Sequence, residues 1–290
     1  MLLILNMDWV SKRLYRLGKA KLNVRELWQL VIHPMTKFEK IWLAIFSAII
    51  LASTFYFSYT GTDWDDWKSI GLNWVISPVS ALTGVLCVIL VARASIYNYS
   101  FGLVQSVLYG YICWVSGYYG DWLLNWFFFV PTQILIYIFW KRNLRPASLD
   151  IVRIARFKRW QILLTIFLSL AALIGFGFAL NSIDSWFINV MKRNVSIYAN
   201  ITAVFGIALI GPMMDSSTEV LQIAAQFLCI ARSPLQWPMW IATNVITILM
   251  WTAVALTDHN QLPIAMPTLL MWVVFLFNSL YGAINWYRRV

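Results

Sequence analysis

The sequence predicts an all-α polytopic membrane protein, and three features of its composition support this fold class. Hydrophobic residues make up 61% of the 290 residues and charged residues only 12%, whereas soluble domains average about 45–50% and about 25%. The mean hydropathy of +0.70 is that of a chain with an apolar excess along its whole length. The net charge of +10 is typical of membrane proteins with basic cytoplasmic loops. This composition excludes a soluble enzyme, a nucleic-acid-binding module and a disordered or disulfide-framed protein.

Eight stretches of the chain are predicted to be membrane-spanning helices, because about 20 apolar residues are enough to cross the hydrocarbon core. They cover residues 41–59, 74–92, 97–116, 122–140, 160–180, 214–231, 236–257 and 265–286. The basic residues 1–40 precede them, and we expect this arm to lie along the cytoplasmic membrane surface. Polar residues from Asn189 to Asn194 interrupt the stretch 186–212, which we interpret as an interfacial or re-entrant connection.

The distribution of basic residues predicts the orientation of the chain. All but three of the 22 Lys and Arg residues lie in the N-terminal arm, the 141–159 linker, the C-terminus and two short loops on the same side. The exceptions, Lys68, Lys192 and Arg193, lie on the opposite side with the acidic residues 63–66. Because basic loops stay in the cytoplasm, both termini are predicted to be cytoplasmic.

The second to fourth predicted spans resemble the sixth to eighth, which indicates an internal repeat. In each set one arginine, Arg93 or Arg232, lies in the short loop between the first two helices. Aligning these arginines places Asn98 on Trp237, Phe101 on Trp240 and Gln105 on Asn244, while the third helices align with Trp126 on Trp272 and Trp140 on Trp286. Because the span 160–180 returns the chain to the outer side, the two repeats are parallel. Such repeats often hold substrate between them, near the bilayer midplane.

The predicted organisation is therefore two three-helix bundles in a 3+1+3 plan, with one extra N-terminal span. Its parts are the cytoplasmic basic arm 1–40, the extra span 41–60, the first bundle 74–140, the linker helix 160–181, an extracytoplasmic connection 182–213 and the second bundle 214–288.

Polar residues within the predicted spans form stripes, and polar groups inside a membrane usually face a bundle interior or an aqueous cavity. The stripes are Trp237, Trp240 and Asn244; Asn98, Phe101 and Gln105; Asp215, Glu219, Gln222 and Gln226; and Asn278 and Tyr281. The alternative is that the tryptophans belong to an aromatic belt and that the amides only join neighbouring helices. Two tryptophans and an amide on one helix face favour binding, whereas Asn125 is expected to lie off that face.

Aromatic faces and amides together suit a flat, cationic ring that carries hydroxyl groups. Aromatic rings attract a cation through their quadrupoles, and amides both donate hydrogen bonds to hydroxyl groups and accept them. A nucleoside, a sugar or a quaternary amine would all fit such a wall. We expect Asp215 and Glu219 to lie at a hydrated outer mouth, as a vestibule through which substrate enters.

Nothing in the sequence indicates a metal site, a cofactor or a catalytic centre. The chain has two histidines, far apart, and its three cysteines lie in apolar runs without CxxC spacing, so neither residue type forms a metal-binding pattern. A phosphate-binding GxxxxGK[ST] loop is absent. The sequence therefore predicts neither a metal nor a cofactor, and its expected partners are a small molecule and the lipid bilayer, not nucleic acid.

The segment from Gln236 to Ile246 carries the pattern WxxWxxxNxI, in which the chain resembles the PnuC family of bacterial nicotinamide riboside transporters. The run Asn98-Tyr-Ser-Phe-Gly and Asp215 support the resemblance, which covers residues 74–288. It implies a SWEET-like fold, two three-helix bundles joined by one linker helix. It also implies that Trp237, Trp240 and Asn244 contact substrate, whereas Asn98, Phe101 and Gln105 are inferred from the internal repeat.

The activity implied by the resemblance is facilitated diffusion of nicotinamide riboside across the bacterial inner membrane, with intracellular phosphorylation trapping the product. The resemblance also implies a homotrimer. Two alternatives stay open, namely a uniporter of another nucleoside or a sugar on the same fold, and an integral membrane enzyme using Asp215 and Glu219 as an acid/base pair. The sequence does not distinguish uniport from ion coupling.

Overall fold

The computed structural model describes residues 31–145, 150–155, 159–190 and 197–289. Most of the predicted basic arm and the charged residues Lys192 and Arg193 therefore lie outside the described residues. The chain divides into two compact units, residues 1–44 and residues 45–290, and each is considered separately.

The described part of the first unit contains the start of helix α3 (Lys37–Gly61). Thr36 and Glu39 form a capping box there, in which two residues satisfy each other's backbone N–H groups at a helix N-terminus. The Glu39 carboxylate accepts from the backbone N–H of Thr36 at 2.7 Å, and the Thr36 hydroxyl accepts from the N–H of Glu39 at 3.2 Å. These contacts explain why the helix begins at Lys37.

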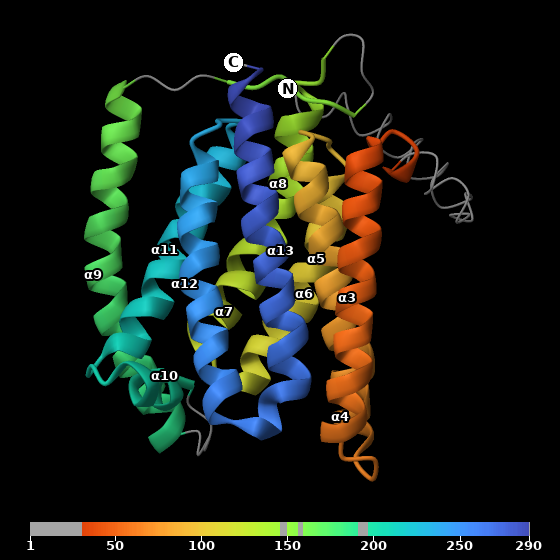
Figure 1. Cartoon of the computed structure of the whole chain (residues 1–290). Helices are drawn as coiled ribbons and strands as arrows, with labels where there is room; N and C mark the ends of the chain where they lie inside the picture. The colour runs from red at the N-terminus through yellow and green to blue at the C-terminus, as the bar shows by residue number, and fades with distance from the viewer. Residues whose placement is uncertain (1–30, 146–149, 156–158, 191–196, 290) are drawn as a thin grey trace, which may run out of the picture. The chain divides into compact units, whose positions relative to one another are not determined.

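The described part of the second unit is built from helices, with two isolated β-bridges beside the linker segment. Figure 1 shows them in chain order. After α3 they are α4 (Trp67–Gly71), the π-helical turn Leu72–Ile76, α5 (Ser77–Ala92), α6 (Asn98–Ser116), α7 (Tyr119–Leu123), the π-helical turn Leu124–Phe129, α8 (Val130–Lys141), α9 (Arg159–Asn189), α10 (Ile197–Phe205), α11 (Ile210–Ile230), α12 (Gln236–Thr257), the short η4 (His259–Gln261) and α13 (Leu262–Tyr287).

Five helical stretches among the described residues are long and apolar enough to cross a membrane. They are Lys37–Gly61, Trp67–Ala92, Tyr119–Lys141, Gln236–Thr257 and His259–Tyr287. A sixth forms if Tyr198–Phe205 and Ile210–Ile230, bent by 113° at their junction, make one span. The chain is thus a helical membrane protein, although fewer stretches meet these limits than the eight spans predicted. One predicted span, α6, carries Asn98, Gln105 and Ser106, which lower its hydropathy.

The predicted linker helix and outer connection differ in extent from the observed helices. Helix α9 continues to Asn189, past the predicted end of the linker at residue 181. The sharp bend between α10 and α11 lies in the stretch that the sequence marks as interfacial or re-entrant. Figure 1 shows α10 at the end of α11, and α9 packs along α11.

The turns between α5 and α6 and between α11 and α12 have the same backbone conformation. Ala94 and Arg232 are both left-handed, with φ of 62° and 61°. The residue after each donates its N–H back into the preceding helix, from Ser95 to Leu90 and from Ser233 to Leu228. Position for position, Arg232 therefore corresponds to Ala94 and not to Arg93.

The predicted alignment of the second helices is consequently wrong by one residue. With Ala94 on Arg232, Asn98 corresponds to Gln236 instead of Trp237, and Ser106, not Gln105, corresponds to Asn244. One residue turns a side chain by about 100° around a helix. The shift therefore changes which α6 residues share the environment of the α12 stripe.

The third helices of the two sets, α8 and α13, are tied to the other set by matching hydrogen bonds. The indole N–H of Trp140 donates to the carbonyl oxygen of Cys229 at 2.9 Å, and that of Trp286 donates to Val91 at 3.1 Å. In the corrected alignment Cys229 and Val91 are equivalent positions. The predicted equivalence of Trp140 and Trp286 fits this reciprocal pair.

Candidate functional site

A cavity of about 90 Å³ lies between the two matched sets of helices. One water needs about 10–15 Å³ by the same measure, so this cavity holds several waters or part of a small organic molecule. Its lining residues are Gly84, Cys87, Val88, Val91, Asn98, Gly102, Gln105, Ser106, Tyr109, Asn125, Phe129, Gln133, Ile136, Gln222, Gln226, Cys229, Trp237, Trp240, Asn244, Trp272, Phe275 and Ser279. None of these described lining residues is charged.

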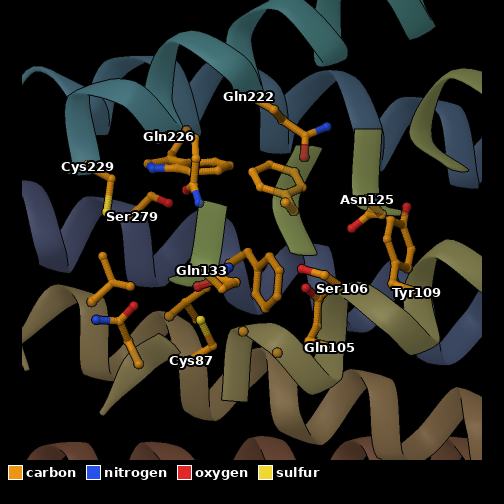
Figure 2. A pocket seen from close by; sticks show the side chains of 18 of the residues that line it. Cys87, Gln105, Ser106, Tyr109, Asn125, Gln133, Gln222, Gln226, Cys229 and Ser279 are labelled. Carbon is orange, nitrogen blue, oxygen red and sulfur yellow. The ribbon is translucent and has the colours of Figure 1, made fainter. Parts of the chain in front are cut away.

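Several lining residues are related by the corrected alignment. Gly84 corresponds to Gln222 and Val88 to Gln226 on the first helices, while Ser106 corresponds to Asn244 on the second. The third helices contribute the pairs Phe129 with Phe275 and Gln133 with Ser279. Figure 2 shows the amides of Gln105 on α6, Gln133 on α8, and Gln222 and Gln226 on α11 around the same space.

The structure brings the predicted residues Trp240 and Asn244 to the cavity wall. The half-buried ring of Trp240 stacks on Phe129, with the ring centroids 6.3 Å apart and the planes 26° apart. The buried Asn244 amide donates to the hydroxyl of Ser279 at 2.9 Å. Because Ser279 fixes this amide, α12 presents both an aromatic face and a positioned polar group to the cavity.

Trp237, the third member of the stripe, lines the cavity near the turn that contains Arg232. Its ring is 2% exposed, and a side chain added at Gly282 would collide with it. The ring also packs edge-on against Trp286, at a centroid distance of 5.8 Å. Within the described residues the indole N–H of Trp237 has no hydrogen-bond partner, so it is a donor available to a molecule in the cavity.

The α6 stripe is only partly in the cavity. Asn98 and Gln105 line it, whereas Phe101 does not. The Asn98 amide N–H₂ donates to the carbonyl oxygen of Ser95 at 2.6 Å, and its buried oxygen has no partner among the described residues. The register error explains the position of Phe101, since the α6 residues that correspond to Trp240 and Asn244 are Gly102 and Ser106.

The predicted α13 residues Asn278 and Tyr281 do not line the cavity. Asn278 is buried and donates to the carbonyl oxygen of Val88 at 2.7 Å, so it joins two helices, which is the alternative considered for buried amides. The residue that lines the cavity here is Ser279, which lies about 100° around the helix from Asn278. The α11 residue Gln222, which is predicted to bind substrate, lines the cavity.

Asp215 and Glu219 are buried in the structure and are not at a hydrated mouth. Their exposed fractions are 0% and 1%, and Asp121 of α7, also 1% exposed, lies beside them. One carboxylate oxygen from each residue lies within 4.8 Å of the others. At an effective dielectric constant of about 20, two unit charges at this distance repel by about 3.5 kcal/mol. The expected vestibule is therefore a closed acidic cluster.

Two neutral side chains donate hydrogen bonds to this cluster. The hydroxyl of Tyr198 donates to Asp215 at 2.6 Å, and the amide of Gln222 donates to Asp121 at 3.2 Å. Because Gln222 also lines the cavity, this amide connects the acidic cluster directly to the candidate site.

Sequence reasoning missed several polar lining residues, among them Tyr109, Asn125, Gln133 and Ser279. Asn125 is buried and lines the cavity, contrary to its expected place off the binding face. The hydroxyl of Tyr109 accepts from the indole N–H groups of Trp251 and Trp272 at 3.2 and 3.3 Å. Gln226, which the sequence places on one helix face with Gln222, also lines the cavity. The offset between the third helices pairs Gln133 with Ser279, and this was the available signal for both.

Adding a methyl group at Gly84 is expected to destabilise the protein. A Cβ at this position would lie 2.7 Å from Cζ of Phe275 and 3.1 Å from the sulfur of Met271. Overpacking lowers the free energy of unfolding by about 1–3 kcal/mol. This exceeds the stabilisation of about 0.5–1 kcal/mol that alanine gives over glycine in a helix. Thermal unfolding of Gly84→Ala in detergent measures the difference.

Gly71→Ala is the matched control, because nothing lies within 4 Å of a Cβ at Gly71. We expect this variant to unfold at the wild-type temperature or slightly above it. If Gly84→Ala and Gly71→Ala unfold together, the contact between α5 and α13 is looser than the structure shows.

An uncharged cavity lined by aromatic rings and amides, between two matched sets of membrane helices, defines the class of small-molecule membrane transporters. The model of the family described as "Nicotinamide mononucleotide transporter" matches residues 73–288. The chain belongs to this family, the PnuC family of membrane transporters.

Individual relatives agree with this assignment. The nicotinamide riboside transporter PnuC of Neisseria mucosa is 31% identical over 255 residues, covering 88% of this chain and 82% of the relative. The protein of the same name from Haemophilus influenzae is 27% identical over 87% of this chain and 91% of its own. A solved structure described as "Crystal structure of the Vitamin B3 transporter PnuC" is similar with a TM-score of 0.66 and 30% identity, covering 91% of this chain and 96% of that chain.

Proposed function

We propose that the protein carries nicotinamide riboside across the bacterial inner membrane by facilitated diffusion, and that intracellular phosphorylation traps the product. The curated relatives are named as transporters of this molecule. The observation that carries the proposal is the cavity wall, where Trp240 and Phe129 offer aromatic faces and Asn244, Gln105 and Gln222 offer amides. The molecule crosses intact, and the protein acts as a transporter without catalysis.

The chemistry of this substrate matches the cavity in three respects. Its pyridinium ring is flat and cationic, so the aromatic faces attract it. Its carboxamide and ribose hydroxyls both donate and accept hydrogen bonds, as amide side chains do. The unpartnered N–H of Trp237 and the amide oxygen of Asn98 supply one further donor and one further acceptor. Phe101, Asn278 and Tyr281 lie outside the lining, and we assign them no direct contact.

We further propose that the helices form the SWEET-like 3+1+3 arrangement, with α5, α6 and α8 in one bundle, α11 to α13 in the other and α9 as the linker. The shared turn geometry at Ala94 and Arg232 and the reciprocal bonds of Trp140 and Trp286 support two parallel repeats. Both turns then face the cytoplasm, as do both termini. The homotrimer implied by the family resemblance stays a prediction.

The riboside is expected to cross the membrane while its mononucleotide does not. A phosphate in this cavity would meet no Lys or Arg among the described lining residues and would lie near the buried carboxylates of Asp121, Asp215 and Glu219. An unpaired charge in such a site costs several kcal/mol. Uptake of the two radiolabelled compounds into proteoliposomes measures the difference, and would also decide between the riboside and the mononucleotide of the family description.

Competition distinguishes the proposal from transport of a sugar on the same fold. Unlabelled riboside is expected to block uptake of the labelled compound, whereas glucose is not. Mononucleotide flux at a rate comparable to that of the riboside would contradict the charge argument. Recovery of a chemically altered product inside the vesicles would favour a membrane enzyme.

A further inference from the structure

The acidic cluster of Asp121, Asp215 and Glu219 is assembled from two helices that are far apart in sequence. Asp121 lies on the short helix α7, whereas the other two residues lie one turn apart on α11. A Cβ at Gly120 would lie 2.6 Å from Oδ2 of Asp215 and 2.9 Å from Oε1 of Glu219. The missing side chain at Gly120 therefore allows the α7 backbone to approach the carboxylates.

A second group beside the cluster lacks a partner. The hydroxyl of Tyr118 is fully buried and has no hydrogen-bond partner among the residues that the structure describes. Tyr118 is the residue directly before α7, and it is two residues from Gly120, where the backbone approaches Asp215 and Glu219. Buried hydroxyl groups normally have a hydrogen-bond partner or another ligand. We therefore expect a bound group to contact the Tyr118 hydroxyl together with the acidic side chains.

The carboxylate of Glu219 also has a buried oxygen, Oε1, that lacks a hydrogen-bond partner in the described part of the chain. The donors from Tyr198 and Gln222 reach Asp215 and Asp121, and Glu219 receives neither. A buried carboxylate needs a hydrogen-bond donor, a proton or a cation.

We propose that Asp121, Asp215, Glu219 and the Tyr118 hydroxyl bind a calcium ion. Four oxygen donors, three of them anionic, are the ligands that hard cations prefer. The three carboxylate oxygens lie within 4.8 Å of one another, so small side-chain movements would bring them to a common ion. Calcium accepts such irregular oxygen cages at about 2.3–2.6 Å, whereas magnesium demands near-ideal octahedral geometry at about 2.1 Å. The prediction of no metal considered only histidine and cysteine patterns, and Asp121 lies far from Asp215 in the sequence.

The ion would also act on the candidate site. Gln222 donates to Oδ1 of Asp121, so fixing that carboxylate fixes an amide of the cavity wall. The calcium site does not depend on which molecule the cavity carries, and it is tested without any transported substrate.

Calcium binding is measured on the purified full-length protein in detergent, by calorimetry and by the luminescence of Tb³⁺, a calcium substitute. We expect one saturable Ca²⁺ site per chain and displacement of Tb³⁺ by Ca²⁺ in preference to Mg²⁺. Glu219→Gln is expected to lower the calcium affinity about tenfold or more, because affinity in oxygen-ligand sites follows the number of charged ligands. Asp65→Asn, which removes an exposed carboxylate, should leave affinity unchanged.

Tyr118→Phe keeps the buried ring and removes only the hydroxyl, so it tests the site even if Glu219→Gln fails to fold. We expect this variant to bind calcium several times more weakly. The proposal is overturned if the wild-type protein binds no calcium, or if Na⁺ protects it from thermal unfolding and Ca²⁺ does not. Equal calcium affinity in Tyr118→Phe and the wild type would remove Tyr118 from the site, and equal affinity in Glu219→Gln and Asp65→Asn would refute the site itself.

Discussion

Trp240→Ala is expected to weaken the binding of nicotinamide riboside by about 1–3 kcal/mol, the value found for losing the stacking of one base on an aromatic side chain. The ring of Trp240 lines the cavity and stacks on Phe129, so the substitution removes half of an aromatic pair. It also opens the wall to water, which weakens any attraction between the remaining rings and a cation. Calorimetry on the purified protein measures the change in affinity.

Trp67→Ala is the control for this experiment, because Trp67 is 76% exposed and lies outside the cavity lining. We expect it to bind the riboside like the wild type. A folded Trp240→Ala protein with wild-type affinity would remove Trp240 from the binding site.

Asn244→Leu is expected to reduce uptake of the riboside sharply at equal membrane abundance. The substitution removes the amide from the cavity and leaves the buried Ser279 hydroxyl without its donor. A buried polar group without a hydrogen-bond partner destabilises the protein by about 1–3 kcal/mol. A substrate group that bonded to the amide would lose a similar amount of binding free energy. Initial uptake rates in proteoliposomes, normalised to reconstituted protein, measure the effect.

The choice of control for this second experiment follows from the structure. Asn125, expected from the sequence to lie off the binding face, lines the cavity and is unsuitable. Asn260 is exposed within the short η4 helix and lies outside the cavity lining, so Asn260→Leu should transport at the wild-type rate. Uptake that falls equally in both variants would deny Asn244 a special role.

The sequence predicted the features that depend on composition and helical period. Apolar stretches of sufficient length identified the helices, because hydrogen-bonded helices are what a chain forms in hydrocarbon. The stripes on α12 and α6 identified Trp237, Trp240, Asn98 and Gln105 as lining residues, since intramembrane polar groups turn inward.

The features that depend on the backbone of a turn or on distant contacts were not predictable in this way. The left-handed residue Ala94 shifts the repeat by one position, and the arginine pattern gave no sign of it. Phe101 was misplaced as a result. Similarly, only tertiary packing shows that Asp121 meets Asp215 and Glu219, so their burial and the role of Asn125 at the cavity were missed.

The indole hydrogen bonds of Trp140 and Trp286 join the two sets of helices at the end of the cavity near the turns of Ala94 and Arg232. Each bond joins the third helix of one set to the first helix of the other, so parting the two sets at this end requires both bonds to break. One intramolecular hydrogen bond contributes a net of about 0.5–1.5 kcal/mol, and the pair therefore contributes about 1–3 kcal/mol. The rings of Trp140 and Trp286 are also buried in one apolar cluster, so separating the helices here costs packing as well as hydrogen bonds. Passive transport, as proposed above, would require thermal motion to break all of these contacts together.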